Sequence, residues 1–208
     1  MGGGVMKMKG NLISSISIIF ILLVSMAMTG CAHNNPISIT AKDIEVNINK
    51  KYPFSIGYII SDSQIKEKVI TLAGGGDKVE YYPYKDMVSP LHSLLERSFL
   101  NARRLQSLQH SKDYEDIFLI LETTIKTDST SDSFMFWPPE QFNVNLSANV
   151  YDNEYNKIFK TKATGFGTAT REEWMTDDGF AGKRAMEMAL KDLIKNNDIL
   201  PDAEHRGI

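Results

Sequence analysis

Residues 142–150 read FNVNLSANV, and this stretch alternates apolar and polar residues throughout. The apolar set is Phe142, Val144, Leu146, Ala148 and Val150, and the polar set is Asn143, Asn145, Ser147 and Asn149. Successive side chains of a β-strand point to opposite faces of its sheet. The alternation therefore predicts a strand with one buried face and one wet face, which is typical of an antiparallel sheet covered on one side.

Two further strands are predicted on either side of this stretch. Residues 117–126 are apolar and then alternate, and residues 155–170 return after a polar turn at 152–154. Gly165 and Gly167 interrupt the second of these strands, and glycine inside a strand marks a bulge or a close packing contact. Three antiparallel strands are thus expected in the second half of the chain.

The first half predicts shorter strands over 52–61, 69–72 and 79–82. A glycine-rich stretch, 73–77, separates the last two. A phosphate-binding P-loop would need Gly-Lys-Ser/Thr at the start of a helix, whereas strand residues follow here. A hairpin turn is the better interpretation.

Two helices are predicted from apolar residues at helical spacing. The first spans 85–103, with Asp86 or Ser89 as its cap and Pro90 in its first turn. The second spans 179–196 after a polar connection. The two apolar stripes are Leu91, Leu94, Leu95, Phe99 and Ala102 in the first helix, and Ala181, Ala185, Met188, Ala189 and Leu193 in the second. This order predicts an α+β two-layer sandwich, with a mainly antiparallel sheet and both helices on one face.

The N-terminus has the pattern of an export signal. Lys7 and Lys9 precede an apolar run from Leu12 to Met28, and small residues and Cys31 follow. Such a pattern is typical of a secretory signal peptide over residues 1–30. An uncleaved membrane helix is the alternative, because about 20 apolar residues suffice to span a bilayer.

The end of this run, Met28-Thr29-Gly30-Cys31, resembles a bacterial lipobox, with Met28 in place of the usual leucine. The resemblance implies that signal peptidase II cuts between Gly30 and Cys31. It also implies that Cys31 carries a diacylglyceryl thioether and an N-acyl chain. Ala32 stands where aspartate commonly marks inner-membrane retention, so the resemblance favours the periplasmic face of the outer membrane.

Cys31 is the only cysteine of the 208 residues, so an internal disulfide is excluded. Two or more acyl chains would give durable anchoring. Residues 31–51 are mostly polar and predict the lipidated cysteine followed by a tether. A short strand starting near Ile44 is an equal alternative. The domain is then expected over 52–200, with a loose tail at 201–208.

Composition limits the function classes. The formal net charge is −3, and a mildly acidic chain argues against nucleic acid as a partner. The four histidines, His33, His92, His110 and His205, lie at no metal-ligand spacing. We therefore expect no catalytic residue, no metal and no cofactor beyond the acyl chains of Cys31.

The most unusual segment is Phe134, Met135, Phe136 and Trp137, between two predicted strands. Loops are usually polar, so a row of large apolar residues requires a reason. Three interpretations of the segment are open: it caps the core, it docks a partner protein, or it dips into the membrane or holds a lipid.

The element order, the FWPP-x-x-F-x-V-x-L run from Phe136 to Leu146, and the Ala-x-x-x-Ala helix after Gly167 provide a second resemblance. The mature chain resembles small proteobacterial outer-membrane lipoproteins of the YajG-like group. It resembles, more remotely, the accessory lipoprotein of lipopolysaccharide transport. The resemblance implies a periplasm-facing binding or assembly role and no catalytic residue.

The resulting hypothesis is a non-enzymatic accessory or scaffold component of an envelope complex, which docks a protein partner through Phe134–Trp137. The alternative is a carrier or chaperone for a lipid or another apolar ligand, held between sheet and helices. An enzyme ranks third.

Overall fold

The computed structural model describes residues 32–40, 44, 51–132 and 138–195. The strands are β1 (Ala32–Asn34), β2 (Tyr52–Ile59), β3 (Val69–Leu72), β4 (Lys78–Tyr81), β5 (Phe99–Leu105), β6 (Ile117–Thr130), β7 (Gln141–Asp152) and β8 (Lys157–Thr168). The helices are α2 (Asp62–Ile65), α3 (Pro83–Ser98), α4 (Arg171–Thr176) and α5 (Phe180–Lys195), with 3-10 turns at Gly74–Gly76 and Gln109–Asp113. The predicted α+β class is confirmed.

The larger sheet has the strand order β5-β2-β6-β7-β8. The three long strands β6, β7 and β8 pair antiparallel, as predicted. However, β2 pairs parallel with both β5 and β6, so the sheet is mixed. Parallel neighbours require a crossover connection. The chain between β2 and β5 makes such a crossover, and α3 is the last element of it before β5.

The smaller sheet has the order β1-β4-β3. Strands β3 and β4 form the predicted hairpin, and β1 adds to β4 in parallel. Gly75 and Gly76 have positive φ angles of 66° and 83°, a conformation that glycine adopts without the steric cost of a Cβ. The glycine-rich stretch 73–77 is therefore a turn, as predicted.

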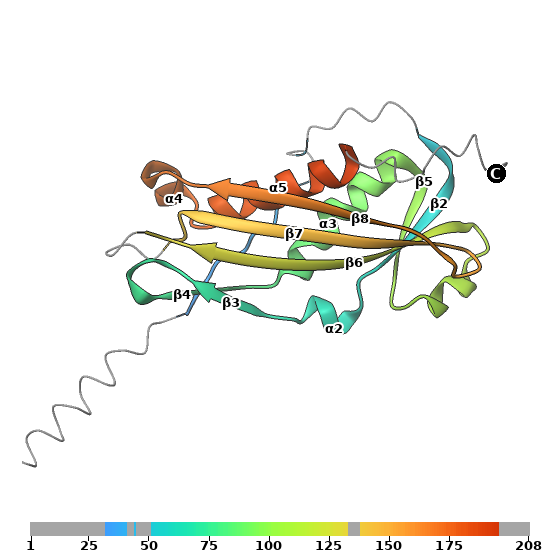
Figure 1. Ribbon diagram of the computed structural model, residues 1–208, viewed down its shortest axis with the longest axis horizontal. Coiled ribbons are helices and arrows are strands. Elements are labelled where there is room, and N and C mark those ends of the chain that lie inside the picture. Colours follow the sequence, from blue (N-terminus) through green and yellow to red (C-terminus); the bar gives the residue numbers. More distant parts are fainter. Residues whose placement is uncertain (1–31, 41–43, 45–50, 133–137, 196–208) are drawn as a thin grey trace, which may run out of the picture. The chain divides into compact units, whose positions relative to one another are not determined.

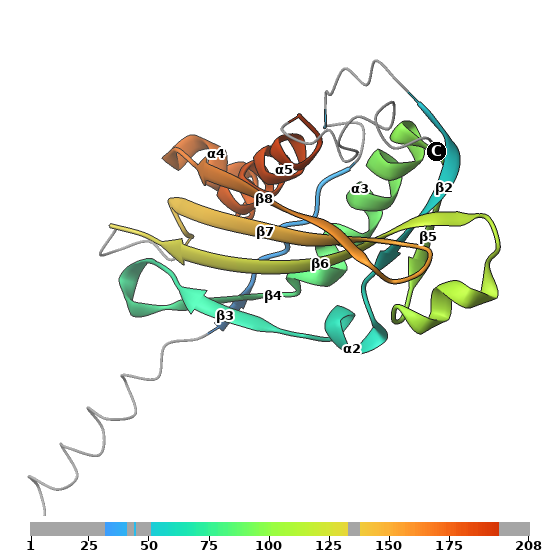
Figure 2. The ribbon, with the colours of Figure 1, turned by 45° about the vertical axis from the view of Figure 1, so that its right-hand side comes forward.

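Helices α3 and α5 both lie behind the long strands in Figures 1 and 2, so they cover one face of the larger sheet. The apolar set of β7 faces them, and all five of its members, Phe142, Val144, Leu146, Ala148 and Val150, are buried. We call this side the covered face and the other side of β6, β7 and β8 the open face.

Helix α5 lies in direct backbone contact with β8. A Cβ added to Gly165 would lie 1.9 Å from the carbonyl oxygen of Ala185, and one added to Gly167 would lie 2.0 Å from that of Ala181. Both glycines are thus required for close packing, which is one of the two roles that the sequence indicated.

The first predicted helix is wrong at both ends. It begins earlier, with Pro83 in its first turn, so Pro90 is interior and Asp86 is buried rather than capping. It ends at Ser98, and Phe99 and Ala102 belong to β5. The ring of Phe99 packs on Tyr52 of β2 with centroids 5.3 Å apart. Pairing with a strand distant in sequence therefore outweighs the helical periodicity.

The polar connection predicted before the second helix is also wrong in part, because α4 (Arg171–Thr176) lies within it. Thr170 and Glu173 form a capping box, in which each side chain accepts a hydrogen bond from the other residue's backbone N–H. This arrangement satisfies two N–H groups that a helix start otherwise leaves unpaired.

The described part of the predicted tether is folded. Ala32–Asn34 is a strand, and Ile37, Ile39 and Ile44 are buried in the main core. The backbone N–H of Ile37 donates to Asp86 Oδ2 at 3.1 Å, and Ile37 also packs on α5 at Gly182. The expected domain boundary at residue 52 is therefore too late, because an apolar residue every few positions was enough to bring this polar segment into the core.

Candidate functional site

The residues singled out from the sequence as functional lie outside the described residues. These are Gly30 and Cys31, the predicted cleavage and lipidation site, and Phe134, Met135, Phe136 and Trp137. Described residues adjoin both. Strand β1 begins at Ala32, directly after Cys31 in the sequence. Pro138 and Pro139, which follow Trp137 in the sequence, are buried.

The neighbours of these two segments meet at one end of the larger sheet. Ala32 pairs with Lys78, and Lys78 pairs with Leu72 across the smaller sheet. The hydroxyl of Ser129 donates to the carbonyl oxygen of Leu72 at 2.7 Å and lies 2.6 Å from the hydroxyl of Thr71. Ser129 is the penultimate residue of β6. The structure thus brings Ala32, the β3–β4 hairpin and the end of β6 together.

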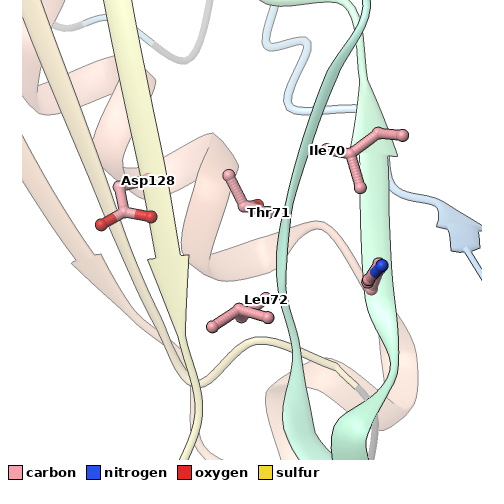
Figure 3. Close-up of a pocket in the computed structure, with 5 residues that line it drawn as sticks. Ile70, Thr71, Leu72 and Asp128 are labelled. Atoms are coloured by element: carbon pink, nitrogen blue, oxygen red, sulfur yellow. The ribbon is translucent and has the colours of Figure 1, made fainter. Parts of the chain in front are cut away.

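This end carries a shallow cavity of about 300 Å³, lined by Ile70, Thr71, Leu72, Lys78 and Asp128. In Figure 3, Thr71 and Leu72 lie between Asp128 and Ile70. Ile70 is 49% exposed and Leu72 is 64% exposed. We call Ile70, Leu72 and Lys78 the hairpin surface. This surface has two apolar side chains and one cation. The sequence did not predict it, because the four residues of β3 are too few to show which side chains are exposed.

The open face carries a second group of polar residues. The register sets Asn145 between Lys126 and Thr164, and sets Ser147 beside Lys162. A depression of about 300 Å³ is lined by residues of all three strands, which are Thr124, Lys126, Asn145, Leu146, Ser147, Lys160, Lys162, Ala163 and Thr164. Sequence reasoning missed this group, although the alternation of Lys160, Lys162 and Thr164 along the chain was available as a signal.

The histidines that the structure describes each lie beside their own acidic or phenolic partner. His33 lies 3.2 Å from Asp77 and His110 lies 3.6 Å from Asp113. His92 lies 3.3 Å from Glu96 and 3.3 Å from the hydroxyl of Tyr58. Among described residues no group of three His, Cys, Asp or Glu side chains could hold a metal ion.

Burial rather than a catalytic arrangement perturbs the pKa values of the core. Burial raises the pKa of Tyr58 to about 12, and Arg104 opposes this shift. Burial also raises the pKa of Asp86, opposed by the N–H of Ile37. Both side chains are buried, and loss of contact with water is the largest cause of each shift. The Tyr58 hydroxyl has His92 Nδ1 as a partner at 3.3 Å.

Comparison with known proteins establishes similarity of fold only. No family model and no curated protein matches the chain. A crystal structure of protein XCC0632 from Xanthomonas campestris, of the family DUF330, has a TM-score of 0.52 at 9% identity; the match covers 84% of this chain and 99% of that chain. A putative neuraminyllactose-binding hemagglutinin homolog from Helicobacter pylori has a TM-score of 0.43 at 16% identity, and the match covers 79% of this chain and 91% of that chain. This TM-score is too low to establish a shared fold.

No helix within the described ranges has both the length and the apolar character that crossing a bilayer requires.

Proposed function

We propose that the chain is an outer-membrane lipoprotein, anchored through acyl chains on Cys31, that acts as a non-enzymatic accessory or scaffold component of a bacterial envelope complex. The start of β1 at Ala32 carries this proposal, because an acylated Cys31 would then attach the folded unit to the membrane without a linker. Leu72 and Lys78 of the hairpin surface lie in the same row of the smaller sheet as Ala32. They would therefore lie close to the lipid headgroups.

The exposed side chains of the hairpin surface suit this position. Leucine and isoleucine side chains gain free energy when they leave water, and a lysine beside them can pair with a lipid phosphate. The connection between β6 and β7 leaves the sheet at this end too, because Thr130 pairs with Gln141. A partner docked through Phe134–Trp137 would thus be held at the membrane surface.

The alternative function, a carrier with an apolar ligand between sheet and helices, is less well supported. Helix α5 contacts β8 through backbone atoms at Gly165 and Gly167, which leaves no space for an acyl chain between them. A closed contact of this kind favours a scaffold, whose core serves stability, over a carrier, whose core must open.

Replacement of the predicted lipidated residue tests the anchor. For Cys31→Ser we expect a precursor that keeps residues 1–30 and incorporates no labelled fatty acid, because the serine hydroxyl does not replace the thiolate in thioether formation. The measurement is radiolabelled palmitate incorporation and intact-protein mass. Met28→Leu, closer to the usual lipobox, serves as the control and should be processed normally. A Cys31→Ser chain that is still acylated and shortened would contradict the proposal.

In-cell photo-crosslinking tests the docking role. A photoreactive residue at Trp137 should give a discrete protein adduct. The same probe at Phe118, which is 46% exposed near the start of β6, should give none. A lipid adduct at position 137 would favour the carrier or a membrane-inserted segment. No adduct at either position, with normal folding and localisation, would exclude docking through this segment.

A further inference from the structure

The open face of β6, β7 and β8 combines three features that together suit a single ligand class. It carries three lysines, a set of hydroxyl and amide groups, and one exposed aromatic ring. We propose that this face binds an anionic saccharide, a sugar that carries phosphate or carboxylate groups. This inference does not depend on acylation of Cys31.

The lysines supply the charge. Lys126, Lys160 and Lys162 all line the one depression, from β6 on one side and β8 on the other. Within the described part of the chain none of the three has a carboxylate within ion-pair distance, whereas Lys68, Lys183 and Lys191 each do. Three ammonium groups at one place repel one another, and an anion that bridges them removes this repulsion.

The polar groups between the lysines suit sugar hydroxyls. Asn145 and Ser147 lie on β7 between the lysine-bearing strands. Their side chains make no hydrogen bond with a described residue. An amide and a hydroxyl can each donate and accept, as the hydroxyls of a saccharide require. A bare phosphate would use only the donors, so the mixture favours a saccharide.

The aromatic ring extends the same row. Phe166 follows Lys160, Lys162 and Thr164 at alternate positions of β8, so it lies on the same face. It is 46% exposed. An exposed phenyl ring beside polar groups is a flat apolar platform on which the C–H face of a sugar ring can pack. The fold leaves this ring exposed to water, although Gly165 and Gly167 on the opposite side of β8 are buried.

The charge balance of the surroundings agrees with this choice of ligand. The chain as a whole is acidic, so general attraction of polyanions is not expected. The lysine group is a local concentration of positive charge. Glu122 and Asp128 of β6 lie on the same face but do not line the depression. A second copy of this chain would bring its own lysines to the same place, which disfavours a face-to-face dimer.

Binding of defined polysaccharides to the purified full-length chain in detergent tests the proposal. The probes are polygalacturonate, which carries carboxylates, inorganic polyphosphate, which carries no sugar, and neutral dextran. We expect polygalacturonate to bind, dextran to fail, and the triple variant K126A/K160A/K162A to lose at least tenfold in affinity. Phe166→Ala should lose several-fold for polygalacturonate and nothing for polyphosphate, because only a sugar ring packs on the phenyl group.

The matched control is K66A/K112A/K157A, which removes the same charge from three exposed lysines outside the depression. Equal losses in both triple variants would show unspecific electrostatics and overturn the site. Polyphosphate binding without polygalacturonate binding, or no effect of Phe166→Ala on a stably folded chain, would overturn the saccharide. A dimer seen by light scattering that Phe166→Ala abolishes would replace the saccharide with a second copy.

Discussion

The two faces of β8 carry side chains of opposite kinds. On the covered face the residues are Thr161, Ala163, Gly165 and Gly167, all small and all buried. On the open face they are Lys160, Lys162, Thr164 and Phe166, all exposed. One strand thus fits a helix backbone on one side and presents charge and an aromatic ring on the other. The difference shows that a period of two residues can give one strand of twelve residues a packed face and a face open to water.

Substitution in the helix layer tests the covered face most strongly. Leu94 of α3 is completely buried. For Leu94→Ala we expect a loss of about 2–5 kcal/mol in the free energy of unfolding, from lost burial and the cavity left behind. The measurement is urea denaturation. Leu72→Ala, on the hairpin surface, is the control and should change stability by no more than about 0.5 kcal/mol. Equal effects would mean that the buried and exposed sides are misassigned.

A single added methyl group distinguishes the two faces of β8 itself. Gly165→Ala should cost about 3 kcal/mol, because its Cβ meets the backbone of α5, which cannot move aside as a flexible side chain would. Thr164→Ala, one residue away on the open face, should change stability by about 0.5 kcal/mol or less. Thermal and urea unfolding measure both variants. A neutral Gly165→Ala would show that α5 does not lie in backbone contact with the sheet.

The smallest expected effect on stability comes from Asp86 of α3, which accepts a hydrogen bond from the N–H of Ile37 in the N-terminal segment. Burial raises the pKa of Asp86 in the folded chain above its usual value near 3.8. A raised folded pKa means that the folded state binds the proton more tightly. The contribution of Asp86 is therefore most favourable below pH 3.8 and is lost as the pH rises through the folded pKa.

Asp86→Asn keeps an oxygen that can accept from the N–H of Ile37 but removes the buried charge. We expect the variant to gain stability over the parent as the pH rises from 4 to 8, measured as melting temperature at each pH. Asp178→Asn, on an exposed aspartate, is the control and should show no such trend. A stability difference that shrinks with rising pH would contradict the assignment.

Some elements were predictable because their information is local. The alternation of Phe142–Val150 predicts β7, the alanines of α5 predict its sheet-facing stripe, and the glycines of 73–77 predict the hairpin turn. In each case residues close together in the sequence either hydrogen-bond through their backbones or lie on the same face of one element. The α+β class follows from the order of such elements.

Other features depend on residues that are far apart in sequence. Phe99 continues the helical periodicity of α3, yet it lies in β5 because β2 offers backbone partners and the ring of Tyr52. Ile37 lies in a polar segment, yet the gap between α3 and α5 buries it. The depression on the open face likewise exists only because the register of β6, β7 and β8 brings Lys126 and Lys162 to the same place.

Neighbouring residues of the chain thus predict its periodic elements and its class of fold, because periodicity and composition are properties of a continuous stretch. Three features could be recognised only in the tertiary structure. They are the parallel pairing of β2, the burial of the N-terminal segment and the convergence of lysines on the open face. Each of these depends on which distant segments meet, and that choice is made by the packing of the whole core.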